Sequence, residues 1–294
     1  AATRDALVRL RAPHATHLGA LRLAELSPGI VALPQPTPTL APATHTNAIL
    51  AGREHAVLID PGATTWPDIQ ILLRALEAAR DVHGRTLSAI WLTHHHDDHI
   101  GAAETVRSRF GVPICAHEDA ARKLAGIGLR VDQTLDDGQQ VTVSTDPLLT
   151  LEVLHTPGHA PGHCCFFDAD RRVLLAGDLV STLSTIVVVP PDGDMDAYLA
   201  SLEKAAAREP ILLIPAHGGP TLDGASRLRK TYAHRLWRES RIVEAWKNGH
   251  RTPDALVAVV YDDVPTRAHP IARRQLDAHL VRLRRSGAID DAPV

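Results

Sequence analysis

The segment Thr93-His94-His95-His96-Asp97-Asp98-His99 decides the interpretation of this chain. It follows an apolar stretch, residues 87–92, that is typical of a buried strand. Imidazole and carboxylate groups are the ligands that zinc and neighbouring divalent metals bind. The ligand candidates in the segment are His94, His96, Asp98 and His99. His95 and Asp97 alternate with them, so we expect these two side chains to point away from the metals.

Three further elements complete such a site. Residues 156–159 (Thr-Pro-Gly-His) form a tight turn that presents His159, while Asp178 and His217 each follow an apolar strand. Because a carboxylate has two oxygens, Asp178 can bind two metals at once. We therefore expect one metal at His94, His96, His159 and Asp178, and a second at Asp98, His99, His217 and the shared Asp178. The alternative, a surface loop that is merely rich in histidine, does not account for these downstream elements.

Strand-like and helix-like stretches alternate over the first 220 residues or so. We expect strands at 29–34, 46–50, 55–60, 87–92, 113–116, 141–144, 148–154, 163–167, 172–176 and 211–215. Helices are expected at 66–80, 101–110 and 194–207. The ligand candidates follow strand ends, and loops of this kind can converge on one edge of a layered α/β fold.

This set of residues resembles the metallo-β-lactamase fold superfamily. The resemblance extends over residues 29–220 or so and rests on Asp60, the His-x-His-x-Asp-His run, His159, Asp178 and His217, in the order of that family. It implies a four-layer αββα sandwich of the α/β class, with two sheets packed face to face and helices outside. It also implies that Asp60 orients a ligand imidazole. A plain turn carboxylate is the alternative for Asp60.

Asp178 distinguishes between branches of this superfamily. Zinc β-lactamases do not use a bridging Asp at this position, and the residue is similar to that of glyoxalase-II-like hydrolases and of the phosphodiesterases or nucleases of the superfamily. Residues 156–163 and 189–195 resemble the lactamase-beta-2-like subgroup. Members of that subgroup include single-strand endoribonucleases and thioesterases that act on polyketides.

The sequence changes in character from about residue 222. We place a catalytic domain at 1–224 and a small winged-helix-like domain at 225–294. The expected elements of the second domain are a helix that ends at Lys247, a helix opened by Thr252-Pro253-Asp254, a loop at 262–270, a helix at 271–285 and a short strand at Ala288-Ile289. This part holds 14 Lys and Arg against 8 Asp and Glu, whereas residues 1–224 hold 17 against 26. A basic tail can contact an anionic partner, but a solvated Arg-rich surface is the simpler explanation.

The ligand set and the resemblance together predict a metal-dependent hydrolase. Two divalent ions roughly 3.5–4 Å apart would share a water molecule and lower its pKa, so that a bridging hydroxide attacks the substrate. Zinc is the expected metal, with iron and manganese as alternatives. The candidate catalytic residues are Asp98, Asp60 and His163. His163 could contact an oxyanion or protonate the leaving group, and a structural role is equally consistent with its position.

Three functions remain open at this point. The favoured one is hydrolysis of a small acyl ester or thioester; the second is cleavage of single-stranded RNA by a phosphodiesterase or endoribonuclease. The arginines of the tail favour RNA, but an aromatic content of 3% provides few stacking platforms. A nucleic-acid-binding regulator is the third, and it would not need an intact set of metal ligands. The C-terminal helices could equally form a lid or the contact of a homodimer.

Composition also bounds the cellular setting. No apolar run reaches the roughly 20 residues that a membrane span needs, so we expect no membrane partner. The first 30 residues lack the uninterrupted apolar centre of a signal peptide. The cysteines Cys115, Cys164 and Cys165 do not form a disulfide framework. We therefore expect a cytoplasmic protein.

Overall fold

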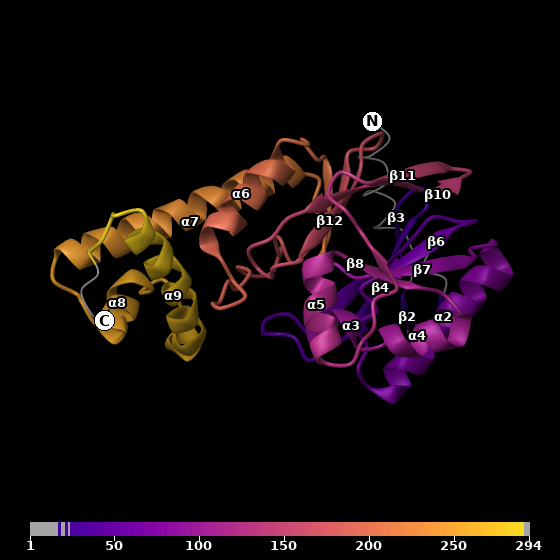
Figure 1. The fold of residues 1–294 in the computed structure, drawn as a ribbon, viewed down its shortest axis with the longest axis horizontal. Helices are drawn as coiled ribbons and strands as arrows, with labels where there is room; N and C mark the ends of the chain where they lie inside the picture. Colours follow the sequence, from indigo (N-terminus) through magenta and orange to yellow (C-terminus); the bar gives the residue numbers. More distant parts are fainter. Residues whose placement is uncertain (1–16, 19–20, 23, 291–294) are drawn as a thin grey trace.

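The computed structural model describes residues 17–18, 21–22 and 24–290. The outer ends of both predicted domains, and most of the segment tested for a signal peptide, lie outside these residues. The chain forms a two-sheet sandwich and a group of C-terminal helices, joined by one long helix (Figure 1). A two-stranded ribbon, β1 (His17–Leu18) and β2 (Leu21–Arg22), precedes the sandwich.

The first sheet has seven strands in chain order. They are β3 (Ala24–Ser27), β4 (Ile30–Pro36), β5 (His45–Ala51), β6 (Ala56–Ile59), β7 (Leu87–Trp91), β8 (Ile114–Ala116) and β9 (Gln133–Thr134). The second sheet has five: β10 (Gln140–Thr145), β11 (Leu148–His155), β12 (Cys164–Asp168), β13 (Val173–Gly177) and β14 (Leu212–Pro215). Pairing is parallel from β6 to β9 and between β13 and β14, and antiparallel elsewhere.

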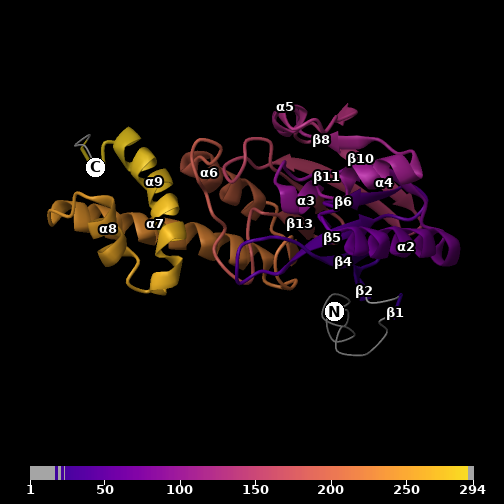
Figure 2. The ribbon, with the colours of Figure 1, turned by 90° about the horizontal axis from the view of Figure 1, so that it is seen from below.

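The helices of the sandwich are α2 (Trp66–His83), α3 (Asp97–Ile100), α4 (Ala103–Phe110), α5 (Glu118–Gly126) and α6 (Met195–Ala206). The helices that follow it are α7 (Gly224–Lys247), α8 (Pro253–Val260) and α9 (His269–Arg285), with a 3₁₀ turn at Thr266–Ala268. Figure 2 shows α7 running from the sandwich to the group formed by α8 and α9.

Side-chain alternation along the strands produces the layers. On β4, Val31 and Leu33 face the helices outside the first sheet, whereas Ile30 and Ala32 face the second sheet. Between the sheets the rings of Trp91 and Phe166 lie 4.9 Å apart. Helices α2, α4 and α5 cover the first sheet, and α6 with the first half of α7 covers the second. The predicted αββα sandwich is confirmed.

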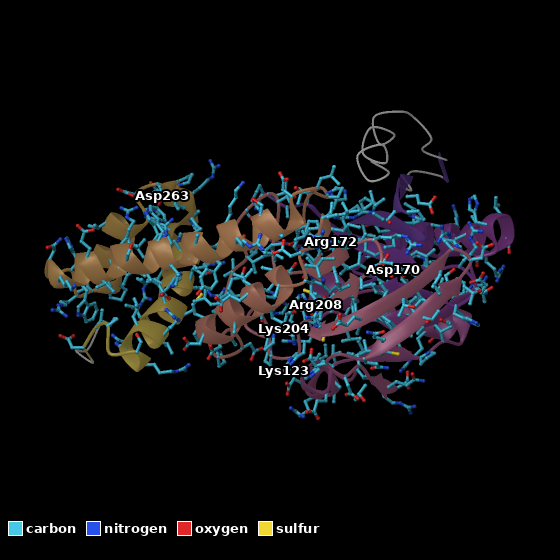
Figure 3. The ribbon with its side chains drawn as sticks, turned by 90° about the horizontal axis from the view of Figure 1, so that it is seen from above. Lys123, Asp170, Arg172, Lys204, Arg208 and Asp263 are labelled. Carbon is cyan, nitrogen blue, oxygen red and sulfur yellow. The ribbon has the colours of Figure 1, made fainter. Side chains whose placement is uncertain are left out.

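Ion pairs join helix α6, and the turn that follows it, to strand β11 and the loops beside it. Lys204 Nζ lies 2.6 Å from the carboxylate of Asp137 and donates to the carbonyl of His155 at 2.9 Å. One turn further on, Arg208 contacts Glu152 of β11 through two nitrogens. Lys204 and Arg208 lie close together on this face of the molecule (Figure 3). The contacts hold α6 next to the loop after β11, from which one ligand candidate comes.

Helix α7 packs against both parts of the chain. Leu228 belongs to the apolar cluster of the sandwich, whereas Ile242 and Trp246 belong to a separate cluster with α8 and α9. Thr252 caps α8 as expected, because its side chain accepts from the backbone N–H of Ala255. The predicted boundary at 224/225 coincides with the start of α7 at Gly224. That division of the chain into domains stays a prediction.

Three expectations for local structure were wrong or incomplete. Residues 225–290, all of which the structure describes, contain no strand, so Ala288-Ile289 does not form one. The amides of Ala288 and Ile289 instead bond back to the carbonyl of Leu283 and close the end of α9. The loop expected at 262–270 contains a 3₁₀ turn and the start of α9. Helix α5 was not anticipated. None of the helices in the described part of the chain is long and apolar enough to cross a membrane.

Candidate metal centre

The seven ligand candidates lie at one edge of the sandwich, each just after a strand. His94 and His96 occupy the turn after β7, and Asp98 and His99 lie in the short helix α3 that follows it. His159 comes from the loop after β11, Asp178 directly follows β13, and His217 follows β14. Parallel pairing of β13 with β14 brings the last two side chains to the same edge. The fold thus brings together all of the residues that the sequence singled out as ligands.

Three histidines converge at one side of the centre. The Nδ1 atom of His96 lies 2.8 Å from Nε2 of His94 and 3.0 Å from Nε2 of His159. Oδ2 of Asp178 lies 3.5 Å from Nε2 of His159. Zinc–nitrogen bonds of about 2.0–2.1 Å place neighbouring ligand atoms of a tetrahedral ion about 3.3 Å apart. The spacing of these four side chains therefore fits one divalent ion.

A second group of ligand atoms lies beside the first. Nε2 of His217 is 3.4 Å from Oδ2 of Asp98 and 3.3 Å from Oδ1 of Asp178. Nε2 of His99 is 3.8 Å from Oδ1 of Asp98 and 3.7 Å from Oδ2 of Asp178. The carboxylate of Asp178 is thus within reach of both groups. The separations are those that two sites sharing Asp178 would need, and the division of the ligands between two metals stays a prediction.

Unsatisfied polar atoms mark the same centre. Nε2 of His99 and Oδ1 of Asp178 are buried and have no hydrogen-bond partner among the described residues. Leaving a buried donor or acceptor unpaired costs about 1–3 kcal/mol, so such atoms are rare in folded proteins. Both atoms belong to the second ligand group. The donor set and its unpaired atoms together fit a pair of divalent cations.

Asp60 holds His99 in place. Its Oδ2 atom accepts from Nδ1 of His99 at 2.9 Å, while its two oxygens also accept from the backbone N–H and hydroxyl of Thr93 at 2.8 and 2.7 Å. Asp60 has a φ of 52°, in the left-handed region. A carboxylate that binds the far nitrogen of a ligand imidazole fixes its tautomer and orientation. The structure places Asp60 where the family resemblance implies.

The other ligand histidines are oriented by groups that the sequence did not reveal. Nδ1 of His159 donates to the carbonyl of Val187 at 2.7 Å, and Nδ1 of His217 donates to that of His45 at 2.9 Å. Asn47 holds the turn around His217, because its amide donates to the carbonyls of Pro215 and Gly218 at 3.0 and 2.8 Å. Carbonyl partners have no side-chain signature, so only the fold identifies them.

Burial and neighbouring charges shift the pKa values of the ligand side chains in different directions. Burial and the surrounding imidazoles lower the pKa of His96 to about 3. Burial also lowers the pKa of His159, to about 4, against the opposing effect of Asp178. These histidines are neutral at pH 7, as metal ligation requires. Burial opposes ionisation of Asp178, but the neighbouring His99 and His217 hold the pKa of its carboxyl well below the usual value.

His163 lies beneath the centre. It is fully buried, and its Nε2 atom accepts from the backbone N–H of Asp178 at 3.0 Å. Its Nδ1 atom lies 2.9 Å from the hydroxyl of Thr156. Gly177 makes room for the ring, since a Cβ atom there would lie 2.7 Å from Nε2 of His163. Both ring nitrogens are therefore engaged within the protein.

His95 points away from the ligand groups. Its Nε2 atom lies 3.2 Å from the carboxylate of Asp192, which also contacts Lys123 at 2.6 Å. Neither His95 nor Asp97 belongs to a group of residues with ligand atoms at metal-binding separation. The alternation along the segment therefore separates ligands from residues that face the surrounding protein.

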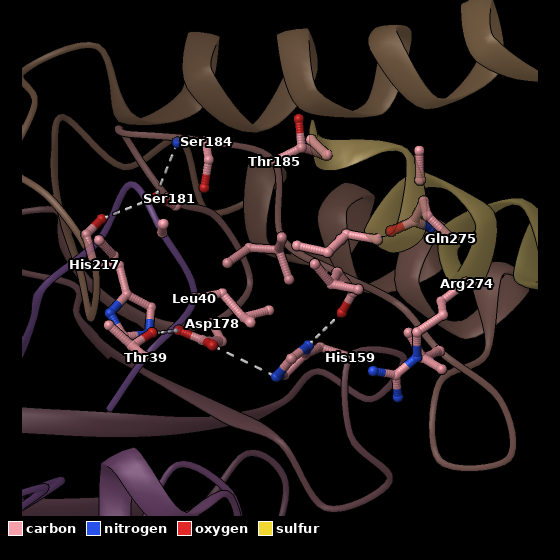
Figure 4. A pocket seen from close by; sticks show the side chains of 18 of the residues that line it. Thr39, Leu40, His159, Asp178, Ser181, Ser184, Thr185, His217, Arg274 and Gln275 are labelled. Carbon is pink, nitrogen blue, oxygen red and sulfur yellow. Dashed lines mark hydrogen bonds and ion pairs between the residues drawn. The ribbon is translucent and has the colours of Figure 1, made fainter. Parts of the chain in front are cut away.

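A cavity of about 700 Å³ opens over the centre. Its walls come from residues 38–43, from the segment around 184–192, and from helices α7 and α9. Figure 4 shows Asp178, His159 and His217 at one side of this pocket and Arg274 and Gln275 of α9 at the other. Ser181, Ser184 and Thr185 of the loop after Asp178 also border it. The C-terminal helices thus help to form the pocket that leads to the metal ligands.

Comparison with known proteins agrees with this geometry. The profile of the metallo-beta-lactamase superfamily matches residues 41–217, and the chain belongs to that superfamily. The profile of the beta-lactamase associated winged helix domain matches residues 252–292. A metallo-beta-lactamase family protein from Thermus thermophilus superposes with a TM-score of 0.72 at 25% identity, over 90% of this chain and 95% of the other. A beta-lactamase domain protein from Burkholderia ambifaria gives a TM-score of 0.78 at 22% identity, over 94% and 91%.

Curated relatives include the hydroxyacylglutathione hydrolases of Brucella ovis and Brucella abortus. Each is 36% identical to this chain over 133 residues, which are 45% of this chain and 48% of the relative. The alignment thus spans about half the length of these relatives. Members of the superfamily bind divalent metals, typically zinc, and the chain holds matching His and Asp groups. The superfamily profile and the grouped His and Asp side chains place a candidate metal centre in this chain.

Proposed function

We propose that the chain hydrolyses the thioester or ester bond of a small acyl substrate, with two zinc ions at the ligand groups. The observation that carries this proposal is the composition of the pocket wall. The cavity that holds the ligands is also lined by the aliphatic side chains of Leu40, Ile186, Val187, Val189 and Ile271. A wall of this kind fits an acyl chain, and the alignment with hydroxyacylglutathione hydrolases supports the same bond type.

Two divalent ions, when bound, activate a water molecule and polarise the carbonyl of the substrate. The residues of this chain do the rest. Asp98 lines the pocket with 17% of its side chain exposed, so its carboxylate can accept the proton of the attacking water. The water oxygen bonds to the carbonyl carbon, the carbon–sulfur bond breaks, and the sulfur takes up the proton. The products are a carboxylic acid and a thiol.

Asp60 and His163 act on this reaction through other residues. Asp60 keeps Nε2 of His99 directed at the second ligand group through its bond to Nδ1. His163 holds the backbone of Asp178, whose carboxylate both groups share. We therefore propose that both are positioning residues. His163 does not line the pocket, so contact with a substrate oxyanion is the less favoured of its two predicted roles.

The RNA alternative finds less support in the C-terminal helices. Three of the tail arginines whose presence favours an RNA role pair with carboxylates of the chain itself: Arg273 with Asp277, Arg282 with Asp196 and Glu239, and Arg285 with Asp194 and Asp196. Apart from histidines, the aromatic lining of the pocket in the described residues is Tyr261. Single-stranded nucleic acids are usually bound on several aromatic side chains. Cleavage of RNA and formation of a homodimer stay predictions.

We propose a cytoplasmic location because the three cysteines are free thiols. Cys115, Cys164 and Cys165 are buried free thiols. Burial raises the pKa of Cys115 to about 11 and that of Cys165 to about 12. Such thiols pack as small apolar side chains and suit a reducing compartment.

A side-by-side assay tests the proposed function. The metal-loaded protein is given an acyl thioester, a p-nitrophenyl ester, bis-p-nitrophenyl phosphate and a single-stranded RNA, with the His96→Ala variant as the blank. We expect turnover of the thioester or the ester that the variant lacks. Turnover confined to the phosphodiester and the RNA would overturn the proposal. Metal analysis of the same preparation decides between zinc, iron and manganese.

A further inference from the structure

The part of the pocket formed by the C-terminal helices contains a second set of unpaired polar atoms. Four residues that line it are more than nine-tenths buried, with exposed fractions of 2% for Arg235, 5% for Tyr261, 6% for Gln275 and 0% for His279. Each has a buried side-chain atom without a hydrogen-bond partner among the described residues: Nε, the hydroxyl, Nε2 and Nε2, respectively. These residues lie on α7, just after α8, and on α9. None of them belongs to the metal-ligand groups.

Arg235 is the exceptional member of this set. Three arginines are buried in the described part of the chain, namely Arg85, Arg235 and Arg238. Arg85 pairs with Glu25, and Arg238 pairs with both oxygens of Asp263. Arg235 has no carboxylate within ion-pair distance among the residues described; it donates to the carbonyl of Ile186 and lies 5.1 Å from the ring of Tyr198. A buried cation without an anionic partner is strongly unfavourable, so this guanidinium lacks its counter-ion.

Arg274 supplies a second cation at the mouth of the pocket. Its side chain is exposed and lines the cavity, and the structure gives it no carboxylate partner in residues 24–290. By contrast, Arg273 and Arg285 of the same helix are both paired, as described above. In Figure 4 the guanidinium of Arg274 lies beyond His159 on the side away from His217. The one carboxylate on this wall, Asp192, is held by Lys123 and His95.

Gln275 and His279 add a hydrogen-bond donor and an acceptor to the two cations. Gln275 accepts the backbone N–H of Val188 with its Oε1 atom, which leaves the two protons of Nε2 free to donate. His279 donates from Nδ1 to Glu239, so its neutral ring presents a lone pair at Nε2. An occupant that satisfies these atoms has an anionic acceptor for Arg235 and Gln275 and, elsewhere on the same molecule, a hydroxyl or N–H donor for His279.

We propose that this region, Arg235, Tyr261, Gln275 and His279 with Arg274 at its mouth, is a subsite that binds an oxyanion at the end of the substrate remote from the scissile bond. The oxyanion is a carboxylate or a phosphate, and Arg235 is its principal partner. The inference rests on the proposed function in one respect, because the other end of the substrate carries the acyl bond that is hydrolysed. The aliphatic wall between the two ends contacts the uncharged middle of the molecule.

The test measures binding separately from turnover. Non-hydrolysable thioether analogues of an acyl thioester are prepared with a terminal carboxylate, phosphate or carboxamide, placed on either the acyl or the thiol half. Isothermal titration gives their affinities for the metal-loaded wild type and for Arg235→Met, Arg274→Met and Arg267→Met. Arg267 is an exposed arginine of the 3₁₀ turn that does not line the pocket, so it is the matched control.

We expect the wild type to bind one anionic analogue about tenfold or more tightly than its carboxamide, as charge-assisted hydrogen bonds provide. The preference should fall toward unity in Arg235→Met, weaken in Arg274→Met and persist in Arg267→Met. Because Arg235→Met removes a buried unpaired cation, its melting temperature should not decrease. If that variant nevertheless unfolds, Arg274→Met still decides the matter. The tighter of the carboxylate and phosphate forms identifies the natural group.

Three outcomes overturn the subsite: equal affinity for charged and neutral analogues, a preference unchanged in both Met variants of the pocket, or a preference abolished by chelation but not by these variants. The last result would place the anion on the metals. Turnover of the corresponding thioesters separates the two proposals. A charge preference in binding without any thioester turnover contradicts the proposed function alone, and turnover that ignores the charge contradicts the subsite alone.

Discussion

The Nε2 atom of His163 accepts a hydrogen bond from the backbone N–H of Asp178 at 3.0 Å. His163 does not line the pocket, yet it fixes the backbone of Asp178, whose carboxylate lies between the two ligand groups. The ring is fully buried, and burial lowers the pKa of His163 to about 3. A neutral ring with its Nδ1 proton directed at Thr156 leaves Nε2 as the acceptor.

Replacement of His163 should therefore weaken metal binding. We expect His163→Leu to lower metal affinity by about 10–100-fold, the usual effect of removing a group that supports a ligand. His163→Gln should retain more of the affinity, because its side-chain oxygen can accept from Asp178. Metal titration of both variants measures the difference. Equal losses in the two variants would show that the hydrogen bond is not what matters.

Asp178→Asn should disrupt both metal sites at once. The change removes the charge that two groups of ligands share, so bound metal should fall from about two ions per chain to fewer than about one, and hydrolysis should be lost with it. His95→Ala is the matched control, since His95 lies in the same segment but contacts Asp192. Elemental analysis of the purified variants gives the result. Full metal content in Asp178→Asn contradicts the shared-ligand arrangement.

Asp60→Asn should affect one metal more than the other. The amide cannot hold His99 with the negative charge that fixes its Nδ1 proton, so the second ion should bind about 10–100-fold more weakly. The group formed by His94, His96 and His159 does not contact Asp60, and its ion should be retained. Competition with a chromogenic chelator resolves the two affinities. A uniform decrease in both affinities would argue for a general loss of folding instead.

Gly177→Ala should destabilise the fold more than Gly84→Ala. Both glycines have positive φ values, 48° and 62°, and each alanine therefore costs about 1–2 kcal/mol from the backbone. A Cβ atom at Gly177 would also lie 2.7 Å from His163, whereas nothing lies within 4 Å of one at Gly84. We expect an additional loss of at least about 1 kcal/mol at Gly177. Urea denaturation of the two variants measures it, and equal losses refute the crowding.

The stability of the C-terminal helices should decrease in mild acid. Burial lowers the pKa of His279, and its contact with Glu239 only partly opposes that effect; the charges of Arg235 and Arg238 lower it further. The unfolded chain binds a proton at this histidine below about pH 6.5, whereas the folded chain does not, so the free energy of unfolding falls as the pH decreases. Denaturation at about pH 7.5 and about pH 5.5 should show a smaller loss in His279→Gln than in the wild type. An identical pH dependence in both would contradict the assignment.

Much of the sandwich and the ligand set follows from local sequence, since apolar strands ending in His or Asp are visible without coordinates. Other features depend on tertiary contacts. Asn47 acts on a turn about 170 residues away, which no local pattern indicates. Helix α5 begins at Glu118 and is capped by the preceding His117, whose ring accepts from the amide of Asp119, and His is not among the usual capping residues. Ala288-Ile289 has the composition of a strand, yet its amides are used to end α9.

The burial of Arg235 also depends on tertiary contacts. In the sequence it is one of 14 basic residues in an Arg-rich tail, most simply interpreted as a solvated surface. Burial of its guanidinium depends on α7 lying against the loop that contains Ile186. The distinction between a surface arginine and a buried, unpaired one therefore appears only when the helices are in place.

Helix α7 has a mechanical consequence for access to the metals. At about 1.5 Å per residue its 24 residues form a rod about 36 Å long, and opposite ends of this rod are anchored in different apolar clusters. If the C-terminal helices moved away from the sandwich, helix α7 would have to bend, and backbone hydrogen bonds near its middle would break. The pocket mouth between the sandwich and the C-terminal helices is therefore expected to keep a fixed width, so that side-chain rotation rather than helix movement admits a substrate.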